Sequence, residues 1–312
     1  MKNKKILVTG AAGFIGSNLV EYLLKDNYVV GVDNLSNGIL NNIKDFQSSP
    51  SFSFSNIDVK ETELLKREME GVDVVFHLSA NADVRRGFDD SKIDFRENVQ
   101  ATHSVLEAMR SKGVKELIFS STSAVYGNAE VIPTPEIYGP LKPISHYGAS
   151  KLAAEAFIFS FSSNYGFKSS IFRFANVVGR RGTHGAIHDF IKKLAKNRSV
   201  LDVLGDGTQT KSYIYVDDCV KGIVELHGKE DGLFNLGTRG RTSVTQIAEL
   251  TVSSYSPGAK INFLGGPGGA GWNGDIKFMG LDITKAFRNG WRYELDSTEA
   301  VKKAIADAGA SQ

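Results

Sequence analysis

A tyrosine and a lysine four residues apart, Tyr147 and Lys151, form the pair in this chain best suited to acid–base chemistry. At that spacing both side chains lie on one face of a helix. A free phenol has a pKa of about 10, and lowering that pKa by about three units takes roughly 4 kcal/mol. A neighbouring ammonium and a second cation in a dry pocket would supply such stabilisation, which predicts that Tyr147 acts as a base.

A run of hydroxyl-bearing residues, Ser120-Ser121-Thr122-Ser123, directly follows a predicted strand. In a doubly wound sheet, ligands bind at the carboxyl ends of the strands. A hydroxyl here can bind the reacting oxygen of a substrate and share its proton with Tyr147. Ser120 and Ser123 are instead expected to satisfy backbone groups at the end of the strand.

The segment Thr9–Gly16 has the spacing of a dinucleotide-binding turn between a strand and a helix. Gly10 allows the tight turn, Gly13 lets the backbone approach a pyrophosphate, and Gly16 lets the helix pack on the sheet. The amides at the start of that helix would hold the phosphates. Asp33 ends the next strand, 17 residues after Gly16. Its carboxylate can accept hydrogen bonds from both ribose hydroxyls and would repel a 2′-phosphate, which favours NAD over NADP.

Short apolar runs alternate with longer amphipathic ones in the first half of the chain, which predicts a parallel sheet with crossover helices. Strands are expected at residues 5–9, 29–33, 51–56, 72–78, 116–121 and 170–174, and helices at 14–25, 61–69, 91–111, 147–165, 186–196 and 244–253. The fold class is therefore α/β, a doubly wound Rossmann sheet with a smaller α/β lobe. We assign residues 1–178 to NAD binding and 179–312 to substrate binding. A later strand near 213–216 is expected to rejoin the sheet.

The composition argues against several classes of protein. With a net charge of +2 and 23% charged residues, the chain offers no reason to expect a nucleic-acid partner. No apolar stretch reaches the ~18 residues of a membrane span, and the run after Lys5 is too short for an export signal. Cys219 is the single cysteine, so a reducing, cytoplasmic location is expected. His184 and His188 lack the glutamate of a zincin motif, so no metal is expected.

Together these residues resemble the extended short-chain dehydrogenase/reductase superfamily, and within it the UDP-galactose 4-epimerases (UDP-glucose 4-epimerases). The likeness covers nearly the whole chain. It rests on Thr9–Gly16, Asp33-Asn34-Leu35, Phe76-His77-Leu78, Asn98, Ser120–Gly127, Tyr147–Lys151, Arg173-Phe174-Ala175-Asn176, Gly205-Asp206-Gly207, Tyr213–Asp218, Asn235-Leu236-Gly237 and Gly274-Asp275. The resemblance implies a NAD-dependent isomerase of galactose metabolism that interconverts UDP-glucose and UDP-galactose.

The resemblance also implies roles for single residues. Thr122, Tyr147 and Lys151 would be catalytic. The cofactor-binding residues would be Gly10, Gly13, Phe14, Ile15, Gly16, Asp33, Asn34, Asp58, Val59, Leu78, Ala80, Asn98, Ser120, Ser121, Tyr147, Lys151 and Phe174. The substrate-binding residues would be Thr122, Tyr147, Asn176, Lys211, Tyr213, Arg241, Trp272, Asp275 and Met279.

In the implied reaction, Thr122 and Tyr147 bind the 4-hydroxyl of the sugar, and Tyr147 removes its proton while hydride passes from C4 to NAD. Lys151 would hold the cofactor ribose. The 4-keto sugar turns over in the pocket and takes the hydride back on its other face, so NAD would stay bound as a prosthetic group. Related 4,6-dehydratases carry Thr-Asp-Glu where this chain has Thr122-Ser123-Ala124, and UDP-glucuronate decarboxylases keep a glutamate at Ala124. Without these carboxylates, elimination and decarboxylation lack proton carriers, which favours epimerisation.

Departures from the family concern the substrate side. Relatives usually place arginines at Lys211 and Trp272 to hold the diphosphate; lysine keeps the charge without the bidentate fork, and tryptophan keeps neither. Candidates to compensate are Arg180, Arg181, Arg239 and Arg241. Met279 stands where the family's pocket limits bulk at the sugar C2, and its flexible, mid-sized side chain leaves N-acetylated sugars open. A UDP-N-acetylhexosamine 4-epimerase, a 4,6-dehydratase, a reductase and a non-catalytic NAD-binding protein remain alternatives.

The aromatic run at residues 157–161, on the helix of Tyr147, is more apolar than one sheet-facing side requires. We expect its outer face to pair with the helix at residues 91–111 in a homodimer. The alternative is that these side chains only complete the core of a single chain.

Overall fold

The computed structural model describes residues 1–272 and 274–310, which form two compact units. The first contains Met1–Val125, His146–Arg173 and Ile223–Phe234, and the second contains Tyr126–Ser145, Phe174–Gly222 and Asn235–Gln312. A single boundary after residue 178 does not describe this interleaving. The division into an NAD-binding part and a substrate-binding part stays a prediction about function.

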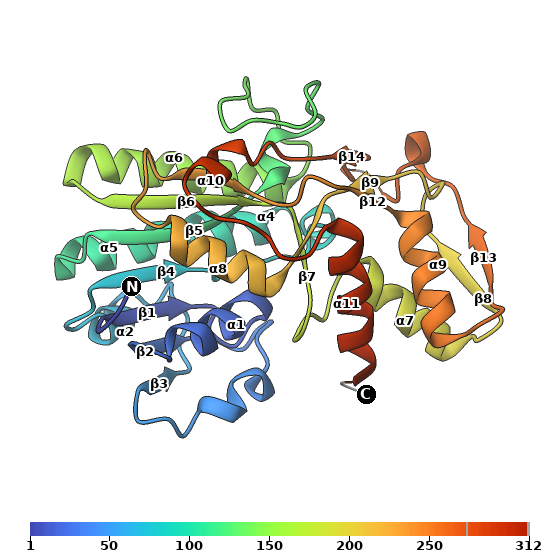
Figure 1. Ribbon diagram of the computed structural model, residues 1–312. Coiled ribbons are helices and arrows are strands. Elements are labelled where there is room, and N and C mark those ends of the chain that lie inside the picture. Colours follow the sequence, from blue (N-terminus) through green and yellow to red (C-terminus); the bar gives the residue numbers. More distant parts are fainter. Residues whose placement is uncertain (273, 311–312) are drawn as a thin grey trace. The chain divides into compact units, whose positions relative to one another are not determined.

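A seven-stranded sheet in the order β3–β2–β1–β4–β5–β6–β11 organises the first unit (Figure 1). Its strands are β1 (Lys5–Thr9), β2 (Tyr28–Val32), β3 (Phe52–Ser55), β4 (Val74–His77), β5 (Glu116–Thr122), β6 (Lys168–Phe174) and β11 (Leu233–Leu236). The pairs β1–β2, β2–β3, β1–β4 and β4–β5 are parallel. The order reverses between β1 and β4, so the switch point where such sheets bind ligands lies at the carboxyl end of β1. The predicted Rossmann sheet is confirmed.

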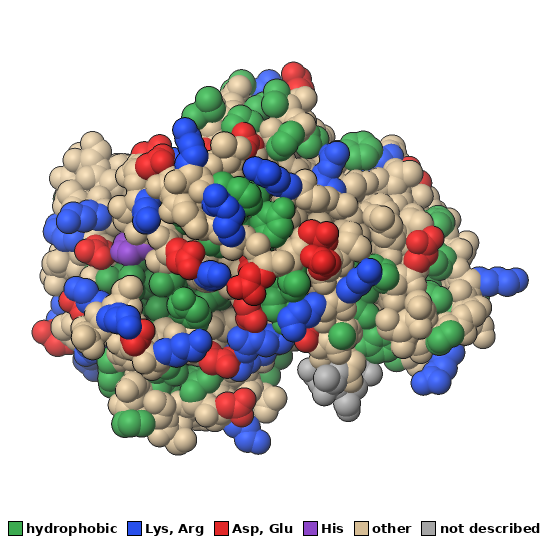
Figure 2. All heavy atoms as spheres, viewed as in Figure 1, with side chains coloured by type: hydrophobic (Ala, Val, Ile, Leu, Met, Phe, Trp, Pro, Cys, Tyr) green, Lys and Arg blue, Asp and Glu red, His purple; other side chains and the backbone are tan. Residues whose placement is uncertain are grey.

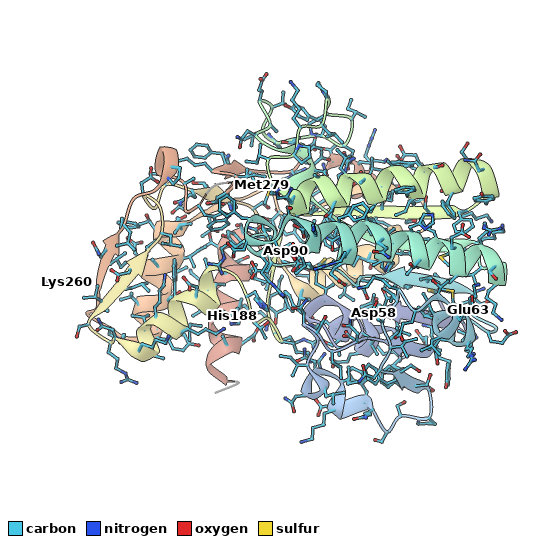
Figure 3. The ribbon with its side chains drawn as sticks, turned by 180° about the vertical axis from the view of Figure 1, so that it is seen from behind. Asp58, Glu63, Asp90, His188, Lys260 and Met279 are labelled. Atoms are coloured by element: carbon cyan, nitrogen blue, oxygen red, sulfur yellow. The ribbon has the colours of Figure 1, made fainter. Side chains whose placement is uncertain are left out.

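Helices cover both faces of this sheet, as continuous apolar strands such as β4 require. The helices are α1 (Phe14–Leu23), α2 (Thr62–Glu68), α3 (Arg86–Asp89), α4 (Ser91–Asp94), α5 (Ala101–Lys112) and α6 (His146–Tyr165), with a 3₁₀ segment η1 at Leu40–Phe46. Helix α1 lies on one face, and α5 and α6 lie on the other (Figures 1 and 3). Buried residues such as Leu106, Phe119 and Ile158 join α5, β5 and α6 into one core.

The helix predicted at residues 91–111 is interrupted. A π-helical turn, η2 (Phe95–Gln100), lies between α4 and α5. Such turns are rare and occur mostly at functional sites. This one contains Asn98, whose carbonyl accepts a hydrogen bond from the Thr102 hydroxyl at 2.6 Å. The prediction of one continuous helix is wrong here because periodicity alone does not report a one-residue change in hydrogen-bond register.

Short strands form three small sheets in the second unit, β7–β10, β12–β9–β14 and β8–β13. They are β7 (Asn176–Val178), β8 (Val200–Val203), β9 (Thr210–Lys211), β10 (Tyr213–Tyr215), β12 (Thr242–Ser243), β13 (Lys260–Phe263) and β14 (Phe278–Met279). The prediction that residues 213–216 rejoin the large sheet is wrong, because β10 pairs with β7 and Tyr213 lies opposite Asn176. Strand β11 instead occupies the edge of β6: Ile171 N donates to Gly232 O, at the start of β11, at 2.6 Å.

The helices that run through or lie within the second unit are α7 (Ala186–Lys196), α8 (Val216–Leu226), α9 (Val244–Tyr255), α10 (Thr284–Arg288) and α11 (Ser297–Ala310). A capping box between Ser243 and Gln246 starts α9. Cys219 on α8 is fully buried, as expected of a core residue, and burial raises the pKa of its thiol. In residues 1–272 and 274–310, the helices are all too short or too polar to cross a bilayer. Basic and acidic side chains are interspersed over the face that Figure 2 shows.

Candidate functional site

The glycine turn after β1 has the geometry that a bound pyrophosphate needs. Gly10 has a φ of +70°, and a Cβ there would come within 2.9 Å of the backbone nitrogen of Ser79. A Cβ at Gly16 would collide with the carbonyl oxygen of Gly10, so only glycine lets α1 start this close to the strand. No side chain caps the first turn of α1, which begins with Phe14 and Ile15, and its amides therefore remain for an anion.

Asp33, just beyond β2, is buried and held by the backbone around it. Its Oδ2 accepts from Ala12 N at 3.0 Å and its Oδ1 from Leu35 N at 2.8 Å. Burial raises the pKa of this carboxyl, and the two amide hydrogen bonds oppose that shift. Each oxygen keeps a further lone pair, which is what a ribose diol requires. The neighbouring Asn34 donates to Asp58, labelled in Figure 3, at 2.9 Å.

The three predicted catalytic residues lie together in the first unit. Thr122 ends β5, and its hydroxyl is hydrogen-bonded to the phenol of Tyr147 in the first turn of α6. Lys151, one turn later, is buried, and its Nζ donates to the carbonyl oxygen of Ser120 at 2.8 Å. Strand β5 and helix α6 thus present a hydroxyl, a phenol and an amine at the carboxyl edge of the sheet.

The protein's own groups do not make the phenol acidic. Burial raises the pKa of Tyr147 to about 12, and the hydrogen bond from Thr122 only partly opposes this. Burial also lowers the pKa of the Lys151 amine to about 7. The expected lowering of the tyrosine pKa by the lysine is therefore wrong for the side chains alone. The second cation expected beside Tyr147 would be the nicotinamide ring of a bound NAD, which would favour the phenolate.

A buried ion pair behind Lys151 was missed by sequence reasoning. Glu155 lies one turn after Lys151 on α6 and accepts from Arg173 on β6, through Nε at 3.0 Å and Nη2 at 2.6 Å. The Ser121 hydroxyl also donates to Glu155, so it can offer a cofactor only acceptor lone pairs. The spacing of four residues between Lys151 and Glu155 was the available signal, since it places both on one helix face.

Most other predicted cofactor residues border the same sheet edge. Leu78 and Ala80 are partly exposed just after β4, whereas Val59 is buried after β3. Asn98 is buried in the π turn and donates to the Ser150 hydroxyl on α6 at 2.8 Å. Phe174, the last residue of β6, is buried at the start of a segment of the second unit.

The second unit gathers several predicted substrate residues around Lys211. Its Nζ donates to Asp275 at 2.6 Å and lies 5.6 Å from the ring centroid of Trp272. Met279 (Figure 3) pairs with Lys211 across β14 and β9. The remaining members are Tyr213, which is hydrogen-bonded to Asn176, and Arg241, whose side chain approaches Gly280.

These features fit a dinucleotide. The strand–turn–helix of β1 and α1 can take the diphosphate, and Asp33 can take a ribose. Among the residues that the structure describes, no cluster of three His, Cys, Asp or Glu side chains could hold a metal ion.

The model of the family "NAD dependent epimerase/dehydratase family" matches residues 6–237. A UDP-glucose 4-epimerase from Mycolicibacterium smegmatis is 34% identical, over 96% of this chain and 97% of its own. A crystal structure of a UDP-galactose 4-epimerase superposes with a TM-score of 0.87 at 38% identity, covering 98% of this chain and 99% of the other. A UDP-glucuronic acid 4-epimerase from Bacillus cereus, crystallised with UDP-glucuronic acid and NAD, superposes at 0.88 with 30% identity, covering 99% and 100%.

Other matches carry the names of UDP-N-acetylglucosamine 4-epimerases and dTDP-glucose 4,6-dehydratases. These matches therefore agree on the class of substrate, a sugar nucleotide, but not on a single sugar or reaction. The chain belongs to the NAD-dependent epimerase/dehydratase family of extended short-chain dehydrogenases/reductases, whose members act on sugar nucleotides.

Proposed function

We propose that this protein is a UDP-glucose 4-epimerase, an isomerase that interconverts UDP-glucose and UDP-galactose through transient oxidation at C4. The observation that carries the proposal is the hydrogen-bonded pair of Thr122 and Tyr147 beside the buried Lys151, with no carboxylate at the two positions after Thr122. Such a set can remove and return a proton at one hydroxyl, and it contains no acid or base for a second site on the sugar.

Each of these residues has a distinct task. Tyr147 takes the proton of the 4-hydroxyl while Thr122 holds the same oxygen, and Tyr147 later returns the proton to the opposite epimer. Lys151, held by the Ser120 carbonyl, places its amine where the cofactor ribose would lie. The glycine turn and Asp33 hold the dinucleotide. NAD, when bound, supplies the hydride acceptor and donor at C4.

On the substrate side, we assign the diphosphate to Lys211 and the sugar C2 region to Met279. Lys211 is 17% exposed and its charge is balanced by Asp275, whose side chain is 3% exposed. A partly buried ammonium of this kind attracts an anion more strongly than an exposed lysine does, because water screens its charge less. Arg241 lies beside Gly280, the residue that follows Met279. The diphosphate then anchors the sugar while it turns over.

A 4,6-dehydratase is the second candidate, since dehydratases are among the relatives. Ala124 argues against it: this residue follows Thr122 so closely that its amide donates to the Thr122 hydroxyl at 3.1 Å, yet its methyl side chain cannot carry a proton. A UDP-N-acetylhexosamine or UDP-glucuronate 4-epimerase would keep the same catalytic residues and differ only in how the sugar is held.

The deciding experiment is incubation of the purified protein, without added reductant, with UDP-glucose, UDP-galactose, UDP-glucuronate and the UDP-N-acetylhexosamines, followed by identification of the products. We expect UDP-glucose and UDP-galactose to interconvert with no net absorbance change at the nicotinamide band. Release of a 4-keto-6-deoxy sugar would establish a dehydratase, and stoichiometric consumption of NADH or NADPH would establish a reductase. Epimerisation restricted to another sugar would replace the proposed substrate.

We also propose a cytoplasmic homodimer that buries the outer face of α6. Within the aromatic run, Ile158 and Phe161 are buried, whereas Phe157 and Phe159 are 39% and 45% exposed. Phe95 in the π turn is 61% exposed. Phe159→Glu should yield a monomer in light scattering, whereas Phe263→Glu, at a phenylalanine of β13 that is 39% exposed, should not. A wild-type monomer would contradict the dimer.

A further inference from the structure

A chain of hydrogen bonds leaves the glycine turn through a buried histidine. The Thr9 hydroxyl accepts from the amide of Ser79 at 3.2 Å and shares the amide of Leu78, at 3.1 Å, with the Thr9 carbonyl oxygen. With both amides directed at its oxygen, the hydroxyl points its own proton to the remaining neighbour, Nδ1 of His77, at 2.8 Å. Thr9 and His77 are both fully buried. The contacts around Thr9 thus make Nδ1 of His77 an acceptor.

The hydrogen bond from Thr9 to Nδ1 determines the tautomer of His77 and the direction of the hydrogen bonds that follow. Burial lowers the pKa of the imidazole to about 3, so the ring is neutral and its proton lies on Nε2. Nε2 then donates to the Thr102 hydroxyl at 3.0 Å. Thr102 in turn donates to the carbonyl oxygen of Asn98 at 2.6 Å. Every hydrogen from Thr9 to the π turn has an assigned acceptor.

The side chain of Asn98 continues the chain to the catalytic helix. Its Oδ1 accepts from Asn81 N at 2.8 Å, which leaves Nδ2 as the donor to the Ser150 hydroxyl at 2.8 Å. Asp94, also buried, accepts from both asparagine amides and fixes their orientation. Ser150 donates to the carbonyl oxygen of Tyr147 at 2.8 Å. The path therefore ends on the turn of α6 that carries the phenol.

We propose that His77, as its Nε2–H tautomer, is a positioning residue that sets the placement of Tyr147 through Thr102, Asn98 and Ser150. Neither His77 nor Thr102 is among the groups assigned to the cofactor or the sugar, so both act only through their neighbours. The inference rests on the proposed role of Tyr147 as the base. It extends that role by making the cofactor turn and the catalytic turn parts of one directed hydrogen-bond chain.

The tautomer can be read without any sugar nucleotide. In the NAD-bound protein labelled with ¹⁵N-histidine, the His77 signals, assigned by their loss in His77→Gln, should show a protonated Nε2 and a bare Nδ1 from pH 8 to pH 5. An Nδ1–H tautomer, or titration of His77 within that range, would overturn the proposal. Because this measurement needs no turnover, an enzyme inactive on UDP-glucose would refute the proposed substrate and leave the inference testable.

Thr102→Val and Thr102→Ser are matched variants for the functional arm. Valine has the shape of threonine but can neither accept from His77 nor donate to Asn98, whereas serine does both. With the sugar nucleotide that the wild type turns over, we expect kcat of Thr102→Val to fall about tenfold or more, since small misplacements of reacting groups are costly. KM and NAD content should stay within about twofold, and Thr102→Ser should recover kcat.

A general loss of stability would lower activity in another way. It would lower the melting temperature and the active fraction, and a lower active fraction reduces apparent kcat at unchanged KM, so kcat is counted per folded, NAD-loaded site. The proposal is therefore refuted if folded, NAD-loaded Thr102→Val keeps wild-type kcat, or if Thr102→Ser fails to recover it. The pH dependence of kcat adds a further readout, because its acid limb reports the ionisable groups of the bound complex. The pH at which this limb falls should change in Thr102→Val and return to the wild-type value in Thr102→Ser.

Discussion

The two units hold the residues proposed for catalysis and for the diphosphate in different ways. In the first, the hydrogen-bond chain from Thr9 to Tyr147 leaves each member with a defined donor and acceptor. In the second, one ammonium, Lys211, is balanced by one carboxylate, Asp275, and lies over an indole ring. Groups that move a proton must be placed within a fraction of an ångström, whereas a diphosphate is recognised mainly by charge. Rigid local order on one side and adaptable charge on the other suit those two tasks.

The sharpest test of the first unit is Tyr147→Phe. Removing one oxygen takes away the phenol that is hydrogen-bonded to Thr122, so we expect kcat to fall by about a thousandfold or more. NAD content and UDP-sugar affinity, measured by absorbance after denaturation and by calorimetry, should stay close to wild type. Normal turnover in this variant would refute the proposed role of Tyr147 as the base, and the contrast between the units would then no longer hold.

The buried pair of Glu155 and Arg173 should dominate the stability of the same unit. Their side chains are 1% and 4% exposed, so Arg173→Met leaves an unpaired charge in the interior. We expect the free energy of unfolding to fall by about 3–5 kcal/mol in urea titrations. The double variant Glu155→Gln with Arg173→Met should recover part of this loss. An effect below about 1 kcal/mol would mean that the pair is hydrated in solution.

In the second unit, Lys211→Ala should act on binding rather than on chemistry. We expect KM for the sugar nucleotide to rise about 10- to 100-fold with little change in kcat, the loss of one charged hydrogen-bonding partner. Lys277→Ala is the matched control, because Lys277 forms a similar pair with Asp206 at 2.9 Å but is not assigned to the substrate. Equal effects of both variants would show that the contact of Lys211 with the diphosphate does not exist.

The last expected effect is a pH-dependent gain in stability from Lys151→Met. Burial lowers the pKa of this amine from 10.5 to about 7, so between those values the unfolded chain binds more protons than the folded one. Wild-type stability should therefore rise as the pH increases from 7 to 10.5. In protein stripped of NAD, Lys151→Met should melt at a higher temperature than wild type at pH 6, and this advantage should shrink by pH 10. A difference independent of pH would contradict the lowered pKa.

Several strands and motifs of the first unit could be predicted because each lies within a short stretch of the chain. The predicted strands at residues 5–9 and 116–121 agree with β1 and β5, and the glycine turn and the Tyr147–Lys151 pair lie where their spacing placed them. These features depend on periodicity and on contacts between near neighbours, which a sequence displays directly. The misplacement of β10 shows the limit: its partner β7 and the strand β11 that occupies the edge of β6 are both separated from β10 along the chain, so local periodicity does not report the pairing.

By itself, the sequence determined the glycine turn after β1, the acidic residue after β2, the pair of Tyr147 and Lys151 and the family resemblance, because each depends on residues close together in the chain. Only the tertiary structure decided which groups support them. His77 contacts Thr9 across 68 residues, Asn98 contacts Ser150 across 52, and Arg173 contacts Glu155 on another element. Local spacing does not assign such partners, because buried donors and acceptors are paired only when packing excludes water and brings distant parts of the chain into contact.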